Sequence, residues 1–265
     1  MSGGPALVST GSALGRLVEG INRDFTLASP DIPHAVRHRL RTALEGSDLY
    51  LDSARLLLSQ LVSEPETESL YFDPGARYTL QVFCWPPGFG NEPHLHTNWN
   101  VSGVMAGSLL VFRSAISEAD CLASQPVIAD MGQAGVLFPP QFHCLRNLGD
   151  EPAITFHVFS LDSAADRLHL ERAPVSLARI DDDGILTIAT EAARRGGMHS
   201  IDIVASAFLA AGNLTKLKIV KLMVDLDPRE AVRMGKTLSR LVGGNDGRRL
   251  LHAIEKLQLA AGQGQ

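Results

Sequence analysis

The sequence predicts a mainly β fold, a barrel or sandwich of short strands, with helices before and after it. Two changes in the spacing of apolar residues lead to this prediction. A helical period over residues 11–62 gives way to strand-sized segments from about 70 to 175, and the helical period returns from about 185. The boundaries that we predict are a helical segment packed on the barrel over residues 1–65, the barrel over 66–178 and a C-terminal helical region over 179–265.

Two helices are predicted within the N-terminal segment. The stretch SPDIPHAVRHRLRTALEG opens with Ser, Asp and Pro, which favour a helix start, and closes on Gly46. Its apolar residues stand four apart, on one face. The stretch SDLYLDSARLLLSQLV follows as a second helix, with Ser47 or Asp48 as its N-cap.

The middle of the chain has the composition of strands and hairpins. From residue 71 onward it is rich in aromatic and β-branched residues and is broken by Gly and Pro, as in YFDPGARYTLQVFCWPPGFG. Further strand-sized segments, each introduced by a turn residue, are GSLLVFRS, GQAGVLFPP and EPAITFHVFS. Several short strands at this spacing predict a closed antiparallel arrangement.

The C-terminal region predicts a series of amphipathic helices. The clearest is DPREAVRMGKTLSRLVGG, with Asp227 as N-cap, Pro228 at the first helical position, Glu230 completing a capping box and Gly243 after the end. The others are IDIVASAFLAAG, LTKLKIVKLMVDL and GRRLLHAIEKLQLAAG. We interpret these helices as packing elements or as the surface of a homodimer, with docking of another partner as the alternative.

Composition and charge exclude several classes of function. A net charge of -5 without a dense Lys/Arg run argues against a nucleic-acid partner. No apolar run is long enough to span a bilayer, and the first residues lack the basic start and apolar block of a secretion signal. The 3 cysteines are far apart without CxxC spacing, which predicts reduced thiols in a cytoplasmic protein.

Two histidine motifs carry the chemistry. His94 and His96 are one residue apart in a strand-like stretch, so their side chains would share one face. The stretch from Gly88 to Gly107 fits G-x5-H-x-H-x3-E-x6-G at every position except that Asn100 replaces Glu. A second pattern, G-x5-P-x-G-x2-H-x3-N, is matched downstream by Gly132, His143 and Asn147, with its Pro and Gly displaced. Two motifs in the right order are much more specific than one His-x-His pair.

These motifs and their surroundings resemble the cysteine dioxygenase branch of the cupins, the thiol dioxygenases. The segments that carry the resemblance are VFCWPPGFGNEPHLHTNWNVSGVMAGSL and FHCLRNLGDEPAITFHVFS, and it covers about residues 45–165. Cys84 and Trp85 stand shortly before the His-x-His pair, as they do in that family. The resemblance implies a cupin barrel and does not extend to the C-terminal hundred residues.

The resemblance also implies a metal site and its surroundings. His94, His96 and His143 would hold one Fe(II), and Asn100 fits because this family lacks the carboxylate ligand of other cupins. His157, oriented by Thr155, would stand behind the ligands, and of the groups there it would be the nearest to bound oxygen. The residue chemistry agrees, since three neutral imidazoles suit Fe, Ni, Cu or Zn and leave the charge of the ion uncompensated. Such a centre favours an anion and deprotonates a bound thiol.

The sequence departs from the family in three places. Phe159 replaces the tyrosine of the Ser-x-His-x-Tyr pattern, and Val101 stands at the position of the cysteine that some animal members cross-link to it. The arginine that binds the substrate carboxylate should fall near Glu68 or Ser69, and neither can replace it. The candidates to take over its role are Arg77, Arg113 and Arg146.

We therefore expect a mononuclear non-haem iron dioxygenase that converts a small thiol to a sulfinate with O2. Free cysteine is expected to be a poor substrate, because its carboxylate would lack the arginine, and a less charged or larger molecule is favoured. One alternative is a three-His cupin oxygenase that acts on a diketone or a natural-product intermediate. The other is a cupin without catalytic activity that binds a metal or ligand.

Overall fold

The computed structural model describes residues 9, 11–27, 31–63, 70–96, 98–161 and 181–262. The chain divides into two compact units. The barrel unit comprises Met1–Leu56 and Glu66–Arg179, and the helical unit comprises Leu57–Pro65 and Ile180–Gln265.

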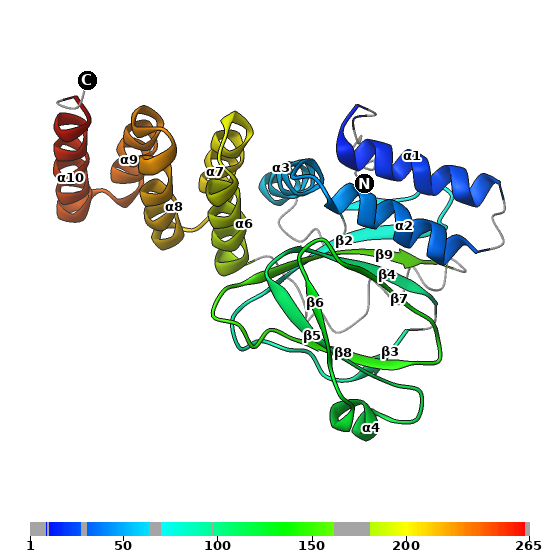
Figure 1. The fold of residues 1–265 in the computed structure, drawn as a ribbon. Coiled ribbons are helices and arrows are strands. Elements are labelled where there is room, and N and C mark those ends of the chain that lie inside the picture. Colours follow the sequence, from blue (N-terminus) through cyan, green and yellow to red (C-terminus); the bar gives the residue numbers. More distant parts are fainter. Residues whose placement is uncertain are drawn as a thin grey trace. The chain divides into compact units, whose positions relative to one another are not determined.

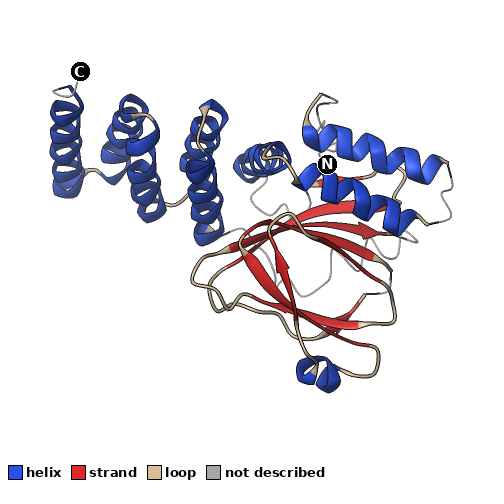
Figure 2. Cartoon of the chain, in the orientation of Figure 1, coloured by secondary structure: helices blue, strands red, loops and turns tan. Residues whose placement is uncertain are grey.

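Two antiparallel sheets form the barrel (Figures 1 and 2). The first has the strand order β1-β2-β9-β4-β7: Tyr71–Phe72, Tyr78–Trp85, Ala153–Ser160, Asn100–Ala106 and Ala134–Leu137. The second has the order β3-β8-β5-β6: His94–Leu95, Phe142–Arg146, Ser108–Ser114 and Val127–Asp130. Between β2 and β9, most strands pair with a strand that is distant in the sequence and not with the next one along the chain. This is the jelly-roll arrangement of two facing sheets. The predicted β barrel is confirmed.

The centre of the first sheet is its most buried part. Every residue of β9 is buried between β2 and β4. Alternate side chains of a strand point to opposite faces, so a strand buried along its whole length is covered on both. Figure 1 shows helices α1 (Ala13–Thr26) and α2 (Ile32–Leu44) over the outer face of this sheet.

Glycines permit two close approaches in the barrel unit. A Cβ on Gly103 would lie 2.5 Å from Leu44 Cδ1, so the missing side chain lets α2 lie against β4. Gly107 joins β4 to β5 with a φ of +70°, in the left-handed region that glycine favours. A Cβ there would lie 2.8 Å from the Pro152 carbonyl oxygen. The loop before β9 therefore closes directly over this turn.

The N-terminal helices follow the sequence pattern. Helix α2 begins after Asp31 and has a Pro in its first turn. Helix α3 (Asp48–Ser63) begins at Asp48, as predicted, and crosses the boundary between the two units at Leu57. Arg39 of α2 donates two hydrogen bonds to the buried Asp24 of α1, at 2.5 and 2.7 Å, which ties the two helices together. A short helix that the sequence did not predict, α4 (Glu118–Ala123), follows β5.

The helical unit confirms the predicted C-terminal helices. Its helices are α6 (Asp182–Arg195), α7 (Met198–Ala210), α8 (Asn213–Leu226), α9 (Pro228–Val242) and α10 (Gly244–Gly262). The side chain of Asp227 caps α9 by accepting from the Arg229 and Glu230 amides, and Gly243 ends the helix with a φ of +66°. The predicted capping box is only half formed, because the Glu230 carboxylate accepts from the Arg233 guanidinium instead. In the part of the chain that the structure describes, no helix is long and apolar enough to cross a membrane.

Candidate metal centre

Three histidines from two neighbouring strands converge in the barrel. His94 lies in β3, His96 follows that strand directly, and His143 lies in β8. His94 and His143 are register partners in the antiparallel pair β3–β8. Leu95, between the first two, points outward and is 46% exposed. The alternation predicted for the His-x-His pair is therefore present, and it turns both imidazoles to the same side.

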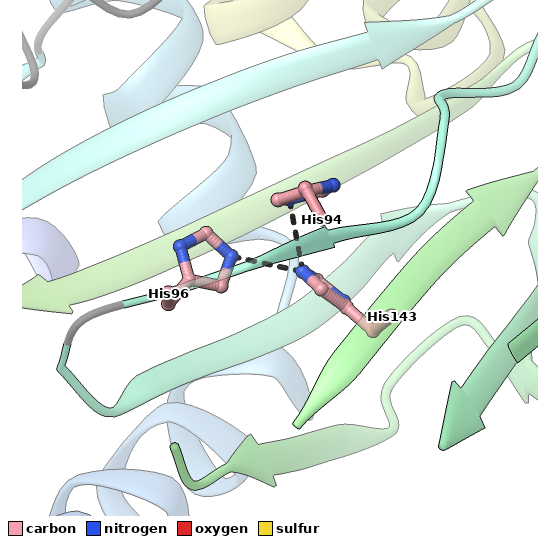
Figure 3. A group of neighbouring side chains, drawn as sticks. All are labelled: His94, His96 and His143. Atoms are coloured by element: carbon pink, nitrogen blue, oxygen red, sulfur yellow. Dashed lines mark hydrogen bonds between the residues drawn. The ribbon is translucent and has the colours of Figure 1, made fainter. Parts of the chain in front are cut away.

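The ring nitrogens of the three histidines face one point (Figure 3). The Nε2 atom of His143 is 2.8 Å from Nε2 of His96 and 3.1 Å from Nε2 of His94. The other nitrogen of His94, Nδ1, is 2.9 Å from the carbonyl oxygen of Glu92. A carbonyl only accepts hydrogen bonds, so Nδ1 carries the proton and Nε2 presents a lone pair to the other two rings.

Burial keeps the imidazoles of His96 and His143 neutral. It lowers the pKa of His96 to about 4, with a smaller effect from His94. It lowers the pKa of His143 to about 2, and His96 and His94 lower that pKa further. A neutral imidazole is the form that binds a metal ion, so both side chains are ready to act as ligands near neutral pH.

The three residues fit a divalent transition-metal ion. Nitrogens that each lie about 2.1 Å from one ion at roughly right angles are about 3 Å from one another, which agrees with the observed spacing. No carboxylate or thiolate joins the group among the described residues. Cys144 follows His143 in β8 and so faces the other way, and burial beside Cys121 raises its thiol pKa to about 11. The set is three imidazole nitrogens, which suits Fe, Ni, Cu or Zn.

A buried hydrogen-bonded chain lies behind the ligands, on β9. The Nε2 atom of His157 is 2.9 Å from the Thr155 hydroxyl, and this hydroxyl also accepts from the Trp85 indole N–H at 2.8 Å. Asn100 Nδ2 is 3.5 Å from Nδ1 of His157, at the limit of a hydrogen bond. Burial lowers the pKa of His157 to about 3, so this ring is neutral as well.

Phe159 joins this chain to the ligands. Its ring stacks on His157 at 5.5 Å between centroids and lies 5.4 Å from the ring of His96. Phe83 contacts His157 edge-on at 4.7 Å. The surroundings of His157 on this side are therefore aromatic. The phenol expected from the resemblance is absent, and the phenylalanine fills its place with an apolar wall.

A cavity of about 390 Å³ reaches His143, one of the three histidines. His143, Asn100 and Thr155 lie in its lining, and Arg113 and Arg37 do so as well. Its size is in the range of sites for small organic ligands, about 300 to 1,000 Å³. The cavity thus gives a small molecule access to the His143 side of the candidate metal centre.

Of the three candidate arginines, Arg113 lines this cavity. Arg77 donates to both oxygens of the buried Asp73, at 2.8 and 2.9 Å, and so is occupied elsewhere. Arg146 lies over the ring of Phe112 at 5.9 Å and is not among the described lining residues. The positions expected for the family arginine, Glu68 and Ser69, lie outside the described residues.

No family profile matches the sequence, and no curated protein is similar to it. Among solved structures, a Klebsiella pneumoniae protein with a double-stranded β-helix domain is 20% identical over 34% of this chain and 71% of its own, with a TM-score of 0.29. A Schizosaccharomyces pombe cupin domain is 11% identical over 37% of this chain and 62% of its own, with a TM-score of 0.30. An oxalate oxidase is 23% identical over 32% of this chain and 42% of its own, with a TM-score of 0.28. The strand order of the two sheets decides the fold. The barrel is a cupin fold.

Two residues of the cupin motifs have structural roles. Asn147 is buried and donates to the carbonyls of Trp85 and Glu151, at 2.8 and 2.9 Å, which holds the turn between β8 and β9. Trp85 packs in an apolar cluster with Leu109 and Leu145. Sequence reasoning missed the hydrogen bond from Trp85 to Thr155. The bond depends on the register of β2 against β9, which the sequence pattern does not contain.

Proposed function

We propose that this protein is a mononuclear non-haem Fe(II) dioxygenase that oxidises the sulfur of a small thiol to a sulfinate. The observation that carries the proposal is the convergence of three imidazoles, at His94, His96 and His143, with no carboxylate beside them among the described residues. These residues would leave the dipositive charge of a bound ion uncompensated, which would favour an anionic ligand such as a thiolate. The ion would supply the redox chemistry with dioxygen. The reaction is balanced without an external reductant, since RSH and O2 together give RSO2H.

The side chains around the ligands fit this role. The aromatic wall of Phe159 and Phe83 keeps one side of the centre apolar, which limits the access of water to reacting groups. His157 is held by the Thr155 hydroxyl and is the titratable group behind this wall. We assign it a positioning role, because it contacts Thr155, Asn100 and the rings of Phe159 and Phe83.

A second candidate function is a three-His cupin oxygenase that acts on a non-thiol substrate such as a diketone. Phe159 favours this candidate, because the phenol that is expected of a thiol dioxygenase is absent. A third candidate is a cupin without catalytic activity that binds a metal or ligand. A protein that retains no divalent ion in the barrel cannot be either enzyme, and one that retains the ion but turns over neither thiols nor diketones fits the third candidate.

Oxygen uptake by the Fe(II)-loaded protein tests the proposal. The protein is offered a panel of thiols and diketones under ¹⁸O2, and the products are analysed by mass spectrometry. We expect a sulfinate in which both oxygens carry the label, and no such product from the zinc-loaded protein. Labelled cleavage products from a diketone, with every thiol unchanged, would favour the second candidate. The metal found after purification does not decide between metals, because iron stands low in the affinity order.

A further inference from the structure

The cavity that reaches His143 becomes apolar along strand β5. Arg113 is the register partner of His143 in the antiparallel pair β5–β8, so both stand at the metal end of the cavity. Val111 and Leu109, two and four residues earlier in β5, line the same cavity, as the alternation of a strand requires. A strand rises about 3.3 Å per residue, so these two positions lie about 7 and 13 Å from the level of His143.

The neighbouring strands continue this apolar lining. Val127 of β6 is the register partner of Val111, and Ala129 is the partner of Leu109. On the other side of β5, Leu145 of β8 is the partner of Val111. Directly opposed side chains lie on the same face of a sheet. These residues of the cavity lining form what we call the apolar section: Leu109, Val111, Val127, Ala129 and Leu145.

The apolar section leaves apolar surface uncovered. Leu109 and Leu145 are buried in the cluster around Trp85 and form its closed side. Val127, by contrast, is 52% exposed although its side chain lies on the cavity face. Removal of such surface from water is favourable, so a ligand that covers it gains affinity. The section therefore fits an apolar group of a ligand.

Gly135 of β7 leaves space on the facing sheet. Gly103 faces α2, and its register partner Ala134 faces the same way. The next residue, Gly135, therefore faces the inside of the barrel. A Cβ on Gly135 would have nothing within 4 Å, and the residue lines the cavity. A side chain at this position would thus enter open cavity, and its absence leaves room for a ligand.

We propose that the apolar section binds the hydrocarbon part of the substrate while the thiol lies at the three histidines. The inference rests on the proposed function, and it specifies the substrate class as an alkyl or aryl thiol whose carbon chain extends past the level of Val111. One cavity joins the section to His143, so a single molecule can occupy both. The arginines of the described lining, Arg37 and Arg113, lie outside the section, so the hydrocarbon part displaces no charge from water.

Binding of a series of thiols to the Co(II)-loaded protein tests this assignment. The probes are propane-1-thiol, butane-1-thiol and hexane-1-thiol, with 5-mercapto-1-pentanol, which matches hexane-1-thiol in length but ends in a hydroxyl group. The thiolate-to-cobalt absorption band reports ligation of the metal and gives a Kd for each probe.

Three variants accompany the wild type, each checked for folding by circular dichroism. Gly135→Leu and Ala129→Leu fill the space at the apolar section, one from each sheet. Ser108→Leu is the matched control, because it adds the same side chain to β5 at an exposed position that is not among the described lining residues.

We expect the Kd to fall about twofold to fourfold for each CH2 that is added from propane-1-thiol to hexane-1-thiol, because each methylene leaves water. 5-Mercapto-1-pentanol should bind at least about fivefold more weakly than hexane-1-thiol, because its hydroxyl group would be moved from water to an apolar wall. Gly135→Leu should weaken hexane-1-thiol by at least about tenfold and propane-1-thiol by less than about twofold, since the added side chain takes the space of the longer chain. Ser108→Leu should leave both unchanged.

Two results would count against these ideas, and they are distinguishable. A Kd that does not depend on chain length, or a dependence that is the same in the wild type and in both filling variants, overturns the assignment of the apolar section. The thiolate band would in that case leave the proposed function standing. Bound Co(II) without a thiolate band from any probe overturns the proposed function itself.

Discussion

His94 and His143 face each other across the β3–β8 pair, with their Nε2 atoms 3.1 Å apart. Their separation is set by the register of two antiparallel strands and by the hydrogen bond from His94 Nδ1 to the Glu92 carbonyl. Backbone pairing therefore places these two histidines side by side. Sites that are built on strands hold their geometry more closely than sites on loops.

The Thr155 hydroxyl is the centre of a testable hydrogen-bonded chain. Thr155→Val would leave the indole N–H of Trp85 and Nε2 of His157 without their partner in a buried place. We expect a loss of about 1 to 3 kcal/mol in the free energy of unfolding, measured by urea denaturation of the metal-free protein. Thr155→Ser keeps the hydroxyl and should lose less than half as much. A loss in Thr155→Val that is no larger than the loss in Thr155→Ser would contradict the role assigned to the hydroxyl.

The buried His157 predicts a pH-dependent stability. Its pKa is about 3 in the folded protein, below the ordinary value of 6.5, so the unfolded chain takes up the proton more readily. The neutral ring therefore contributes stability that is complete above pH 6.5 and is lost as the pH falls toward 3, at up to about 1.4 kcal/mol per pH unit. In the metal-free protein, His157→Gln should flatten the decline between pH 6.5 and 4.5. If the free energy of unfolding declined equally with pH in the variant and the wild type, His157 would not be the source of the decline.

The turn at Gly107 predicts a large cost for a small substitution. Gly107→Ala places a Cβ in the left-handed region and 2.8 Å from the Pro152 carbonyl oxygen. We expect a loss of about 2 kcal/mol or more in the free energy of unfolding. Gly135→Ala in β7 is the matched control, because nothing lies within 4 Å of its Cβ position, and it should change stability by less than about 0.5 kcal/mol. Comparable losses at both glycines would refute this reading of the turn.

Local patterns in the sequence predicted the parts of the fold that local chemistry determines. The helix around Asp227 and Pro228 begins where the capping signals place it, and His94 and His96 share a face because a strand alternates. The sequence did not predict that Glu230 would bond to Arg233. Its carboxylate had two possible partners, the backbone amide of Asp227 in a capping box and the guanidinium three residues on.

Relationships between strands could not be predicted in this way. Arg113 was one of three candidates because the sequence does not contain the register that sets it opposite His143. The same holds for Thr155, which meets Trp85 only because β2 pairs with β9 along its whole length. Helix α4, with 6 residues, is too short to show a period.

Free cysteine is predicted to be a poor substrate of the Fe(II)-loaded protein. Its ammonium group would enter a cavity whose described lining carries Arg113 and Arg37 but no carboxylate. We expect kcat/KM for cysteine to be at least about tenfold below that for 3-mercaptopropionate, because an unpaired charge in a partly dry site is costly. The comparison is made by oxygen uptake at equal thiol concentration. Efficient turnover of cysteine at micromolar concentration would contradict the prediction.

Anaerobic Fe(II) titration of the wild type and of His94→Ala, His96→Ala and His143→Ala tests the central claim most directly. His38→Ala, which changes an exposed histidine of α2, is the control, and circular dichroism checks that each variant is folded. We predict one Fe(II) per chain in the wild type and in the control. Each of the other three variants, still folded, should lose at least about tenfold in affinity, because one of three ligands is gone. A folded His143→Ala protein that binds Fe(II) as tightly as the wild type would show that the metal lies elsewhere.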